Sequence, residues 1–263
     1  IILSKCVGIV ATGLYSNYSM ILSSLSGILN QVFGSFTSSL GNAHIKQNAE
    51  QKYMSYRRLL FANLWITSVC TVCLYNLLND FITIWVGADM LLSDLTVTVL
   101  CMQFFIETAR IISMAYTNGC GLFVRDKIRP LIEASINLGV SIIMANLFGI
   151  AGVFIGTIVS HLCTVFWREP YLLYKYEFGK SMKEYCYYYG VAVALTIGLC
   201  FLTVQLSRPL FPERKTLVTW ILKGNFIFIL SNIIAAVLLH RCSEFGFYVS
   251  FLRKQFVGYL RQV

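Results

Sequence analysis

Residues 217–240, LVTWILKGNFIFILSNIIAAVLLH, form an apolar stretch that contains one lysine, Lys223. About 20 consecutive apolar residues in a helix match the thickness of the hydrocarbon core of a bilayer. Lipid offers the backbone no hydrogen-bond partner, so a stretch of this kind closes its own hydrogen bonds as an α-helix. The stretch therefore predicts a helix that crosses a membrane.

Six further runs have the same character. They lie at 8–40, 58–79, 94–119, 130–147, 150–167 and 186–206. The runs are longer and more uniformly apolar than the alternating strands of a membrane β-barrel. We therefore predict an all-α, polytopic transmembrane helical bundle with about seven spans.

The composition agrees with this prediction. Of 263 residues, 57% are apolar and only 13% are charged, too few charges to cover a soluble protein of this size. The net charge of +9 could suggest nucleic acid, but the basic residues lie in short clusters between the apolar runs, so we expect no nucleic-acid partner. Cys70 and Cys73 form a CxxC inside an apolar run without a second ligand pair, so we expect neither a metal nor a cofactor.

The basic residues occur in alternate connections between the runs. They are Lys46, Lys52, Arg57 and Arg58 after the first run, Arg125, Lys127 and Arg129 after the third, and Arg168, Lys175, Lys180 and Lys183 after the fifth. The positive-inside rule places these connections in the cytoplasm, together with the basic C-terminal tail. The connection at 207–216 is net positive on the opposite side and does not fit. We expect prolines 130 and 170 at helix edges, and prolines 209 and 212 to end a helix.

Polar residues in the first run indicate a special surface. Asn17, Asn30, Gln31 and many serines provide more polar atoms than a lipid-facing helix needs. One face of this helix either borders a water-filled cavity or packs closely against other helices, where small and polar residues bond across the interface. The residues alone favour neither alternative.

Two opposite charges lie within the third run. Glu107 and Arg110 are three residues apart, on one face of a helix. A charge in the middle of a bilayer is costly, so both side chains should point into the protein. They either line a cavity or form a self-neutralising structural pair.

The fourth and fifth runs carry further polar groups. Glu133 and Asn137 are one turn apart near the start of the fourth run, where Glu133 either anchors Arg129 or Arg125 or contacts a substrate. His161, in the fifth run, is predicted to be a packing residue. Because phosphate-binding loops, nucleophile elbows and HExxH zinc motifs are missing, we expect no enzymatic activity and no catalytic residues.

Several strings point to a known family. Residues 13–18 read GLYSNY, 31–42 QVFGSFTSSLGN, 129–134 RPLIEA, 149–157 GIAGVFIGT and 167–171 WREPY. Together they resemble the second half of bacterial polysaccharide-repeat-unit flippases of the Wzx type, O-antigen and capsule flippases in the superfamily of multidrug, oligosaccharidyl-lipid and polysaccharide exporters. The chain opens on Ile1 without a signal-peptide pattern, and we expect it to be the C-terminal piece of a longer protein.

The resemblance implies an architecture and a substrate. It implies the second bundle of a two-bundle exporter fold, with a flippase core at 1–185 and two additional helices and a cytoplasmic tail at 186–263. Such exporters open a central cavity alternately to the two sides of the membrane. The implied substrate is an undecaprenyl-diphosphate-linked oligosaccharide crossing the bacterial inner membrane, and the implied partners are this substrate, membrane lipids and a polysaccharide polymerase complex. A multidrug exporter, a lipid II flippase and, less favoured, a membrane-embedded polysaccharide polymerase remain as alternatives.

The resemblance also suggests roles for the polar residues. The expected substrate-binding residues are Arg110, Glu107, Asn17, Asn30, Gln31 and Asn137. Those expected at a cytoplasmic gate are Arg129, Glu133, Arg168 and Glu169. Arg110 is the best candidate for holding an anionic sugar or diphosphate, because a guanidinium presents a planar pair of donors and keeps its charge.

Overall fold

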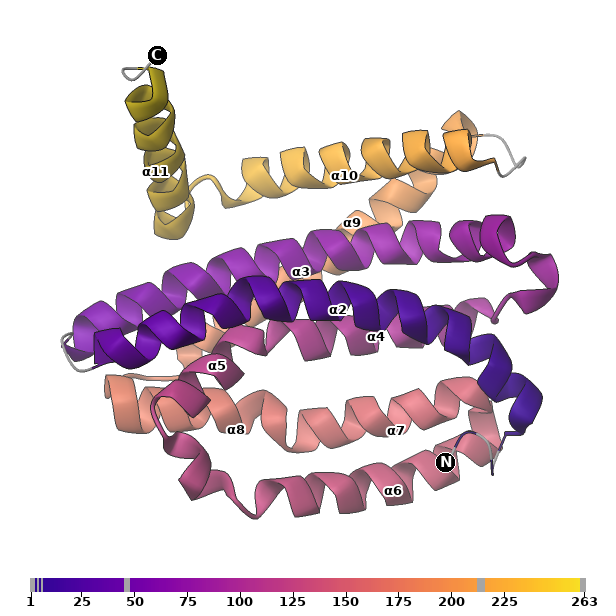
Figure 1. Ribbon diagram of the computed structural model, residues 1–263, viewed down its shortest axis with the longest axis horizontal. Helices are drawn as coiled ribbons and strands as arrows, with labels where there is room; N and C mark the ends of the chain where they lie inside the picture. Colours follow the sequence, from indigo (N-terminus) through magenta and orange to yellow (C-terminus); the bar gives the residue numbers. More distant parts are fainter. Residues whose placement is uncertain (1–2, 4, 6, 45–47, 212–215, 261–263) are drawn as a thin grey trace.

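The computed structural model describes residues 3, 5, 7–44, 48–211 and 216–260, and every regular element in that part of the chain is helical (Figure 1). The helices are α2 (Ile9–His44), α3 (Ala49–Trp85), α4 (Asp94–Ala109), α5 (Ile111–Gly119), α6 (Arg129–Phe148), α7 (Ile150–Cys163), α8 (Val165–Leu172), α9 (Lys183–Leu210), α10 (Leu217–Leu239) and α11 (Ser243–Leu260). Two short 3₁₀ segments, η1 (Ala88–Met90) and η2 (Leu122–Asp126), and a π-helical segment, η3 (Leu173–Phe178), complete the set.

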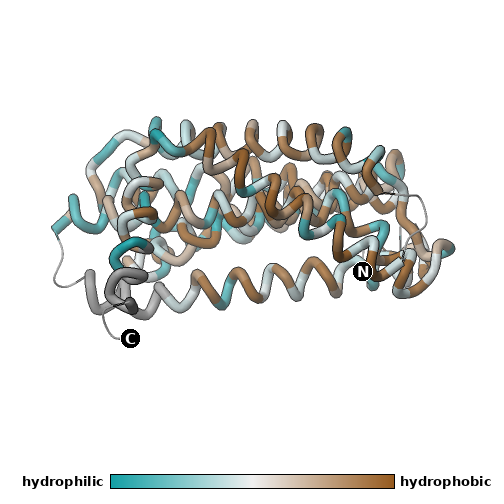
Figure 2. The backbone as a smooth tube through the Cα atoms, turned by 90° about the horizontal axis from the view of Figure 1, so that it is seen from above, coloured by the Kyte–Doolittle hydropathy of each residue, from teal (hydrophilic) through white to brown (hydrophobic). Residues whose placement is uncertain are grey.

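The protein is a polytopic membrane protein, as predicted. Six helical segments within the described residues are long and apolar enough to cross a membrane, at 49–85, 94–119, 129–148, 150–178, 183–210 and 217–239. The first predicted run corresponds to α2, which is long but is not among the six. Figure 2 shows apolar residues over much of the helix lengths and hydrophilic residues gathered towards the end that holds the C-terminus.

Helix α3 is the centre of the packing. It contacts α2, α4, α5, α9 and α10, and Tyr56, Leu60 and Ile82 on its length are fully buried. Its start is fixed by a capping box, in which Asn48 accepts a hydrogen bond from the backbone N–H of Gln51 and Gln51 returns one to Asn48. A long helix with neighbours on several sides organises the rest of the bundle.

The last two spans are tied to α3 by polar contacts as well as by packing. Asn76 of α3 donates to the hydroxyl of Thr203 on α9 at 2.9 Å. Lys223 of α10 donates to Asp80 of α3 at 2.7 Å. Paired polar groups of this kind hold helices together where lipid provides no hydrophobic driving force between them. The boundary at residue 185 stays a prediction, but α9 and α10 pack on the same central helix as the preceding spans.

Two of the spans are interrupted, which the sequence did not predict. The third run divides at Arg110, between α4 and α5, and the fifth divides at Thr164, between α7 and α8. At the first break the amide of Asn63 on α3 donates to the carbonyls of Thr108 and Ala109, at 3.0 and 2.9 Å. At the second, the indole N–H of Trp167 donates to the carbonyl of Cys163 at 3.0 Å. Side chains thus donate to carbonyls at both breaks, and the carbonyl of Thr108 also accepts from the backbone N–H of Arg110.

Replacing Asn63 with leucine should lower the free energy of unfolding by about 2 kcal/mol, because the carbonyls of Thr108 and Ala109 would lose the amide of Asn63 as a donor at a fully buried position. The measurement is the denaturation of purified protein in detergent. Asn146→Leu is the matched control, because Asn146 is exposed on α6 and donates only to its own helix, to Ile142. The control should change stability by less than about 0.5 kcal/mol. Equal effects of the two substitutions would show that the break does not depend on Asn63.

The predicted corner between the fourth and fifth runs is confirmed. Helix α6 ends at Phe148 and α7 begins at Ile150, and Gly149 between them has φ +58°, a conformation that glycine adopts at little cost. A methyl group on Gly152 would overlap the backbone of Met144, and one on Gly156 would overlap Ser141. The two glycines, four residues apart, let α6 and α7 approach backbone to backbone.

Three details of the sequence interpretation need correction. Pro170 lies inside α8 and not at a helix edge; the break at Thr164 places it in a new, short helix. The fifth span continues to Phe178 through η3, beyond the predicted end at 167. Residues 243–260 of the predicted tail form a further helix, α11. Pro209 lies in the last turn of α9, and Pro212 falls outside the described residues.

Candidate functional site

The polar residues predicted on α2 lie away from the core. The core side of α2 is formed by Tyr18, Leu29 and Phe33. Asn30 and Gln31 are exposed and Asn17 is half-buried. Exposed serines on the same helix bond back to their own helix, as in the bond from Ser24 to the carbonyl of Met20 at 2.7 Å. Helix α2 therefore presents to its surroundings a surface that carries polar groups and is largely satisfied internally.

Arg110 at the break between α4 and α5 pairs with Glu169 of α8. Its Nη2 and Nε donate to the two carboxylate oxygens at 2.5 and 3.2 Å, which is the bidentate arrangement. Glu169 is only 2% exposed. Glu107 and Arg110 do not form the predicted pair with each other. Helix α4 ends at Ala109, before Arg110, and Glu107 accepts a hydrogen bond from Gln103 at 2.8 Å.

Asp126 joins two of the predicted gate residues. This buried carboxylate of η2 accepts from Arg129 of α6 at 2.5 Å and from Arg168 of α8 at 3.1 Å. Arg129 also lies 3.9 Å from Glu169, so that Asp126 and Glu169 both hold two arginines. Asp126 was not among the predicted residues, because it follows the third run in what looked like a solvated loop.

Glu133 connects α6 to α7. It accepts from Arg129 at 3.0 Å, which confirms the anchoring alternative, and its second oxygen lies 3.3 Å from Nε2 of His161. His161 is therefore a packing residue with a polar partner. Nearby, the amide of Asn137 donates to the hydroxyl of Thr157 on α7 at 3.0 Å, so that Asn137 holds the α6–α7 pair together.

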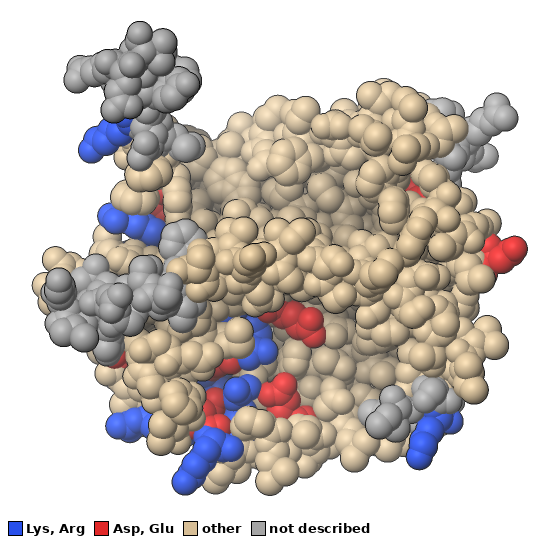
Figure 3. Space-filling view, in the orientation of Figure 1, with Lys and Arg blue, Asp and Glu red and all other residues tan. Residues whose placement is uncertain are grey.

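We refer to Arg110, Asp126, Arg129, Glu133, Arg168 and Glu169 as the charged cluster. The structure brings together all four predicted gate residues and Arg110 in this cluster, which joins the break between α4 and α5 to η2, α6 and α8. Figure 3 shows blue and red side chains gathered in a hollow on the face seen in Figure 1, towards the end where α6 begins. Because each arginine has a carboxylate partner, the cluster acts first as a set of crosslinks between helices.

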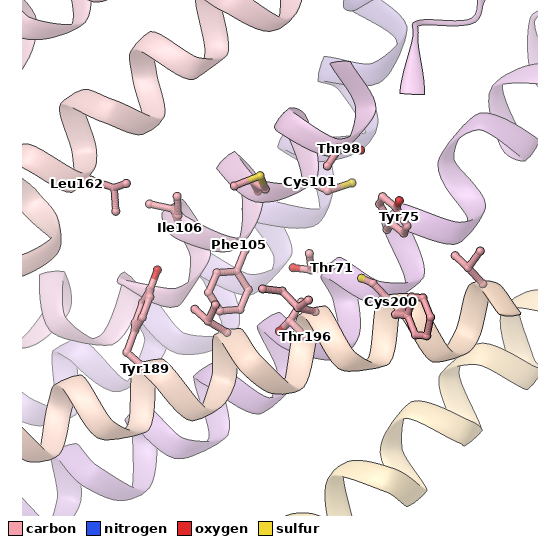
Figure 4. Close-up of a pocket in the computed structure, with 15 residues that line it drawn as sticks. Thr71, Tyr75, Thr98, Cys101, Phe105, Ile106, Leu162, Tyr189, Thr196 and Cys200 are labelled. Carbon is pink, nitrogen blue, oxygen red and sulfur yellow. The ribbon is translucent and has the colours of Figure 1, made fainter. Parts of the chain in front are cut away.

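An apolar pocket of about 500 Å³ lies beside α4, α7 and α9 (Figure 4). Its lining residues include Tyr75, Phe105, Ile106, Leu162, Tyr189 and Phe201. Ile106 and Leu162 are the chain neighbours of Glu107 and His161, so α4 and α7 carry polar groups next to positions that line the pocket. The volume and the lining suit hydrocarbon chains.

Comparison with known protein families, curated proteins and solved structures finds no match to this chain. Sequence reasoning did not single out Asp126, Gln103 and Asn63. Asn63 donates to carbonyls 45 and 46 positions away, and Asp126 lies outside the predicted runs, whereas Gln103 pairs with Glu107 one turn away within the third run. Only the acidic character of Asp126 between basic residues could have suggested its role.

Proposed function

We propose that this protein is one helical bundle of an exporter that moves an undecaprenyl-diphosphate-linked oligosaccharide across the bacterial inner membrane. The observation that carries the proposal is the charged cluster, set in a hollow of a transmembrane bundle. A lipid-linked oligosaccharide has a polar head that cannot cross hydrocarbon unaided and an apolar chain that can remain there. A polar hollow and an apolar pocket in one bundle meet both requirements.

In this proposal the charged cluster has a gating role. Its ion pairs connect the break between α4 and α5 to α6 and α8, at the end of the bundle where the basic connections gather. The positive-inside rule makes this the cytoplasmic end. A gate must hold helices together in one state and release them in another, and exchangeable ion pairs can do both. When the pairs open, Arg110 and Arg129 would offer their guanidinium groups to the diphosphate in place of Glu169.

The strings that resemble Wzx-type flippases support the same substrate class. The interrupted spans at Arg110 and Thr164 support a transporter more generally, because discontinuous helices are frequent at transporter binding sites. The alternatives within the superfamily, a multidrug exporter and a lipid II flippase, would use the same bundle with other ligands. Complementation experiments distinguish these alternatives from the proposed function.

The experiment is complementation in three bacterial strains, which lack a polysaccharide flippase, a polysaccharide polymerase or the main drug exporters. The gene in full length should restore surface polysaccharide in the first strain and should change neither of the other two. Arg110→Lys keeps the charge but loses the bidentate geometry, and it should reduce surface polysaccharide about tenfold at equal protein abundance. Lys127→Arg, at an exposed position of the same end, is the matched control and should retain full activity.

Drug resistance without polysaccharide would favour the multidrug exporter. Rescue of the polymerase-deficient strain alone would favour the polymerase. Failure in flippase-deficient strains with several different sugar pathways would contradict the proposal.

A further inference from the structure

The last helix, α11, does not run along the bundle. Figure 1 shows α11 crossing the direction of α10, at the end of the bundle where α3 begins, and Figure 2 shows it at the same end. It follows α10 after residues 240–242. The spans run across the bilayer, so a helix set crosswise at their ends runs along the plane of the membrane surface.

The start of α11 is fixed to the bundle. Glu244, which is 3% exposed, pairs with Arg57 of α3 at 2.6 Å. The hydroxyl of Tyr248 donates to the carbonyl of Arg58 at 3.0 Å, and Phe245 stacks on Trp65 with 5.7 Å between ring centroids. These contacts fix the position of the start of α11 against α3.

Beyond these contacts, α11 has both apolar and basic side chains that the bundle does not cover. Val249 is 48% exposed and Phe251 is 49% exposed. Arg253 and Lys254 follow and are exposed. Between 240 and 263 the sequence holds four Arg and Lys residues, at 241, 253, 254 and 261, and one acid, Glu244. That acid is already paired with Arg57, so the segment presents uncompensated positive charge beside exposed apolar groups.

We propose that α11 is an interfacial helix that binds anionic phospholipid headgroups. Helices that lie in the membrane interface combine apolar side chains, which enter the acyl boundary, with lysines and arginines that meet the headgroups. Anionic lipids concentrate on the cytoplasmic leaflet and attract basic segments next to a membrane span. Val249 and Phe251 provide the apolar contact and Arg253 and Lys254 provide the charge. The lipid contact holds α11, and through Glu244 it holds the start of α3.

The test is hydrogen exchange of the full chain in nanodiscs that hold one copy each. Discs of phosphatidylcholine alone are compared with discs that contain phosphatidylglycerol. Backbone amides around 246–254 should exchange about tenfold more slowly in the anionic discs, because two basic side chains gain headgroup contacts. Amides of α10 should exchange alike in both. About 1 M salt should remove most of the difference, because it screens exposed charges.

Two variants complete the test. Reversing both charges in Arg253→Glu with Lys254→Glu should abolish the difference between the lipids, and these exposed positions should tolerate it. Arg208→Glu reverses an exposed charge in the last turn of α9, at the end of the bundle away from α11. It should leave the difference between the lipids intact. Equal exchange in the two lipids, or a difference that survives the double reversal, overturns the proposal. Protection that appears only in discs with two copies would identify another chain as the partner and would overturn it as well.

Discussion

Replacing Glu169 with alanine is expected to lower the free energy of unfolding by about 3 kcal/mol. Glu169 is almost fully buried and provides the bidentate partner of Arg110. Its removal leaves the guanidinium of Arg110 in a poorly hydrated place without a counter-ion, and a buried unpaired charge is far more costly than a missing surface pair. Denaturation in detergent measures the loss of stability. Complementation at equal protein abundance measures the accompanying loss of transport, which we expect to be complete if the cluster is the gate.

Two further variants separate the structural from the functional contribution of the pair. Glu50→Ala removes the partner of Lys180 at an exposed site, where the side chain of Glu50 is 63% exposed. It should cost less than about 1 kcal/mol. Arg110→Met combined with Glu169→Leu replaces the whole pair by apolar groups and should recover most of the stability, but not the transport. A loss from Glu169→Ala no greater than that from Glu50→Ala would mean that the pair is well hydrated.

Substituting valine for Gly156 is the second change with a large expected effect. Even a methyl group there would overlap Ser141 on α6, so the larger side chain must push α6 and α7 apart. Overpacking of this kind costs about 3 kcal/mol. Separating the helices would also stretch the hydrogen bond between Asn137 and Thr157, which crosses the same contact. Loss of stability in detergent and increased proteolysis near Gly149 are the readouts.

Gly139→Ala is the matched control for that experiment. Gly139 lies on α6, in the same helix pair, but nothing lies within 4 Å of a methyl group at this position. Alanine is the better helix former, so the control should be neutral or gain about 0.5 kcal/mol. If the two substitutions had similar effects, the close approach of α6 and α7 would not be what stabilises the pair.

The spans were predictable because each depends on its own residues alone. Residues 217–240 have to be helical in lipid whatever their neighbours are, and the run at 58–79 lies entirely within α3. The breaks at Arg110 and Thr164 were not predictable in the same way. Arg110 is a good helix former, and its helix breaks where Asn63, 47 positions earlier in the sequence, donates to the carbonyls of Thr108 and Ala109. Local spacing contains no information about that partner.

The candidate site shows the same limit. The spacing of three residues predicted that Glu107 and Arg110 either form a pair or line a cavity, but the partner of Arg110 is Glu169, on a helix that is remote in sequence. The four predicted gate residues were grouped from strings that resemble a known family. Arg129 contacts Glu133 and Glu169, and Asp126 links Arg129 to Arg168. Asn17, Asn30 and Gln31 on α2 were predicted from polarity alone. They have no common partner among the described residues, and their role in substrate binding stays a prediction.

The pairing within the charged cluster has an electrical consequence. Three arginines, 110, 129 and 168, meet three carboxylates, 126, 133 and 169, so the cluster as a body carries no formal net charge. A single charge that crosses the membrane potential gains or loses about 2.3 kcal/mol per 100 mV. If the paired cluster moved through the membrane as one body, its energy would therefore hardly depend on the membrane potential. The voltage across the membrane would act on the cluster only while its pairs are separated.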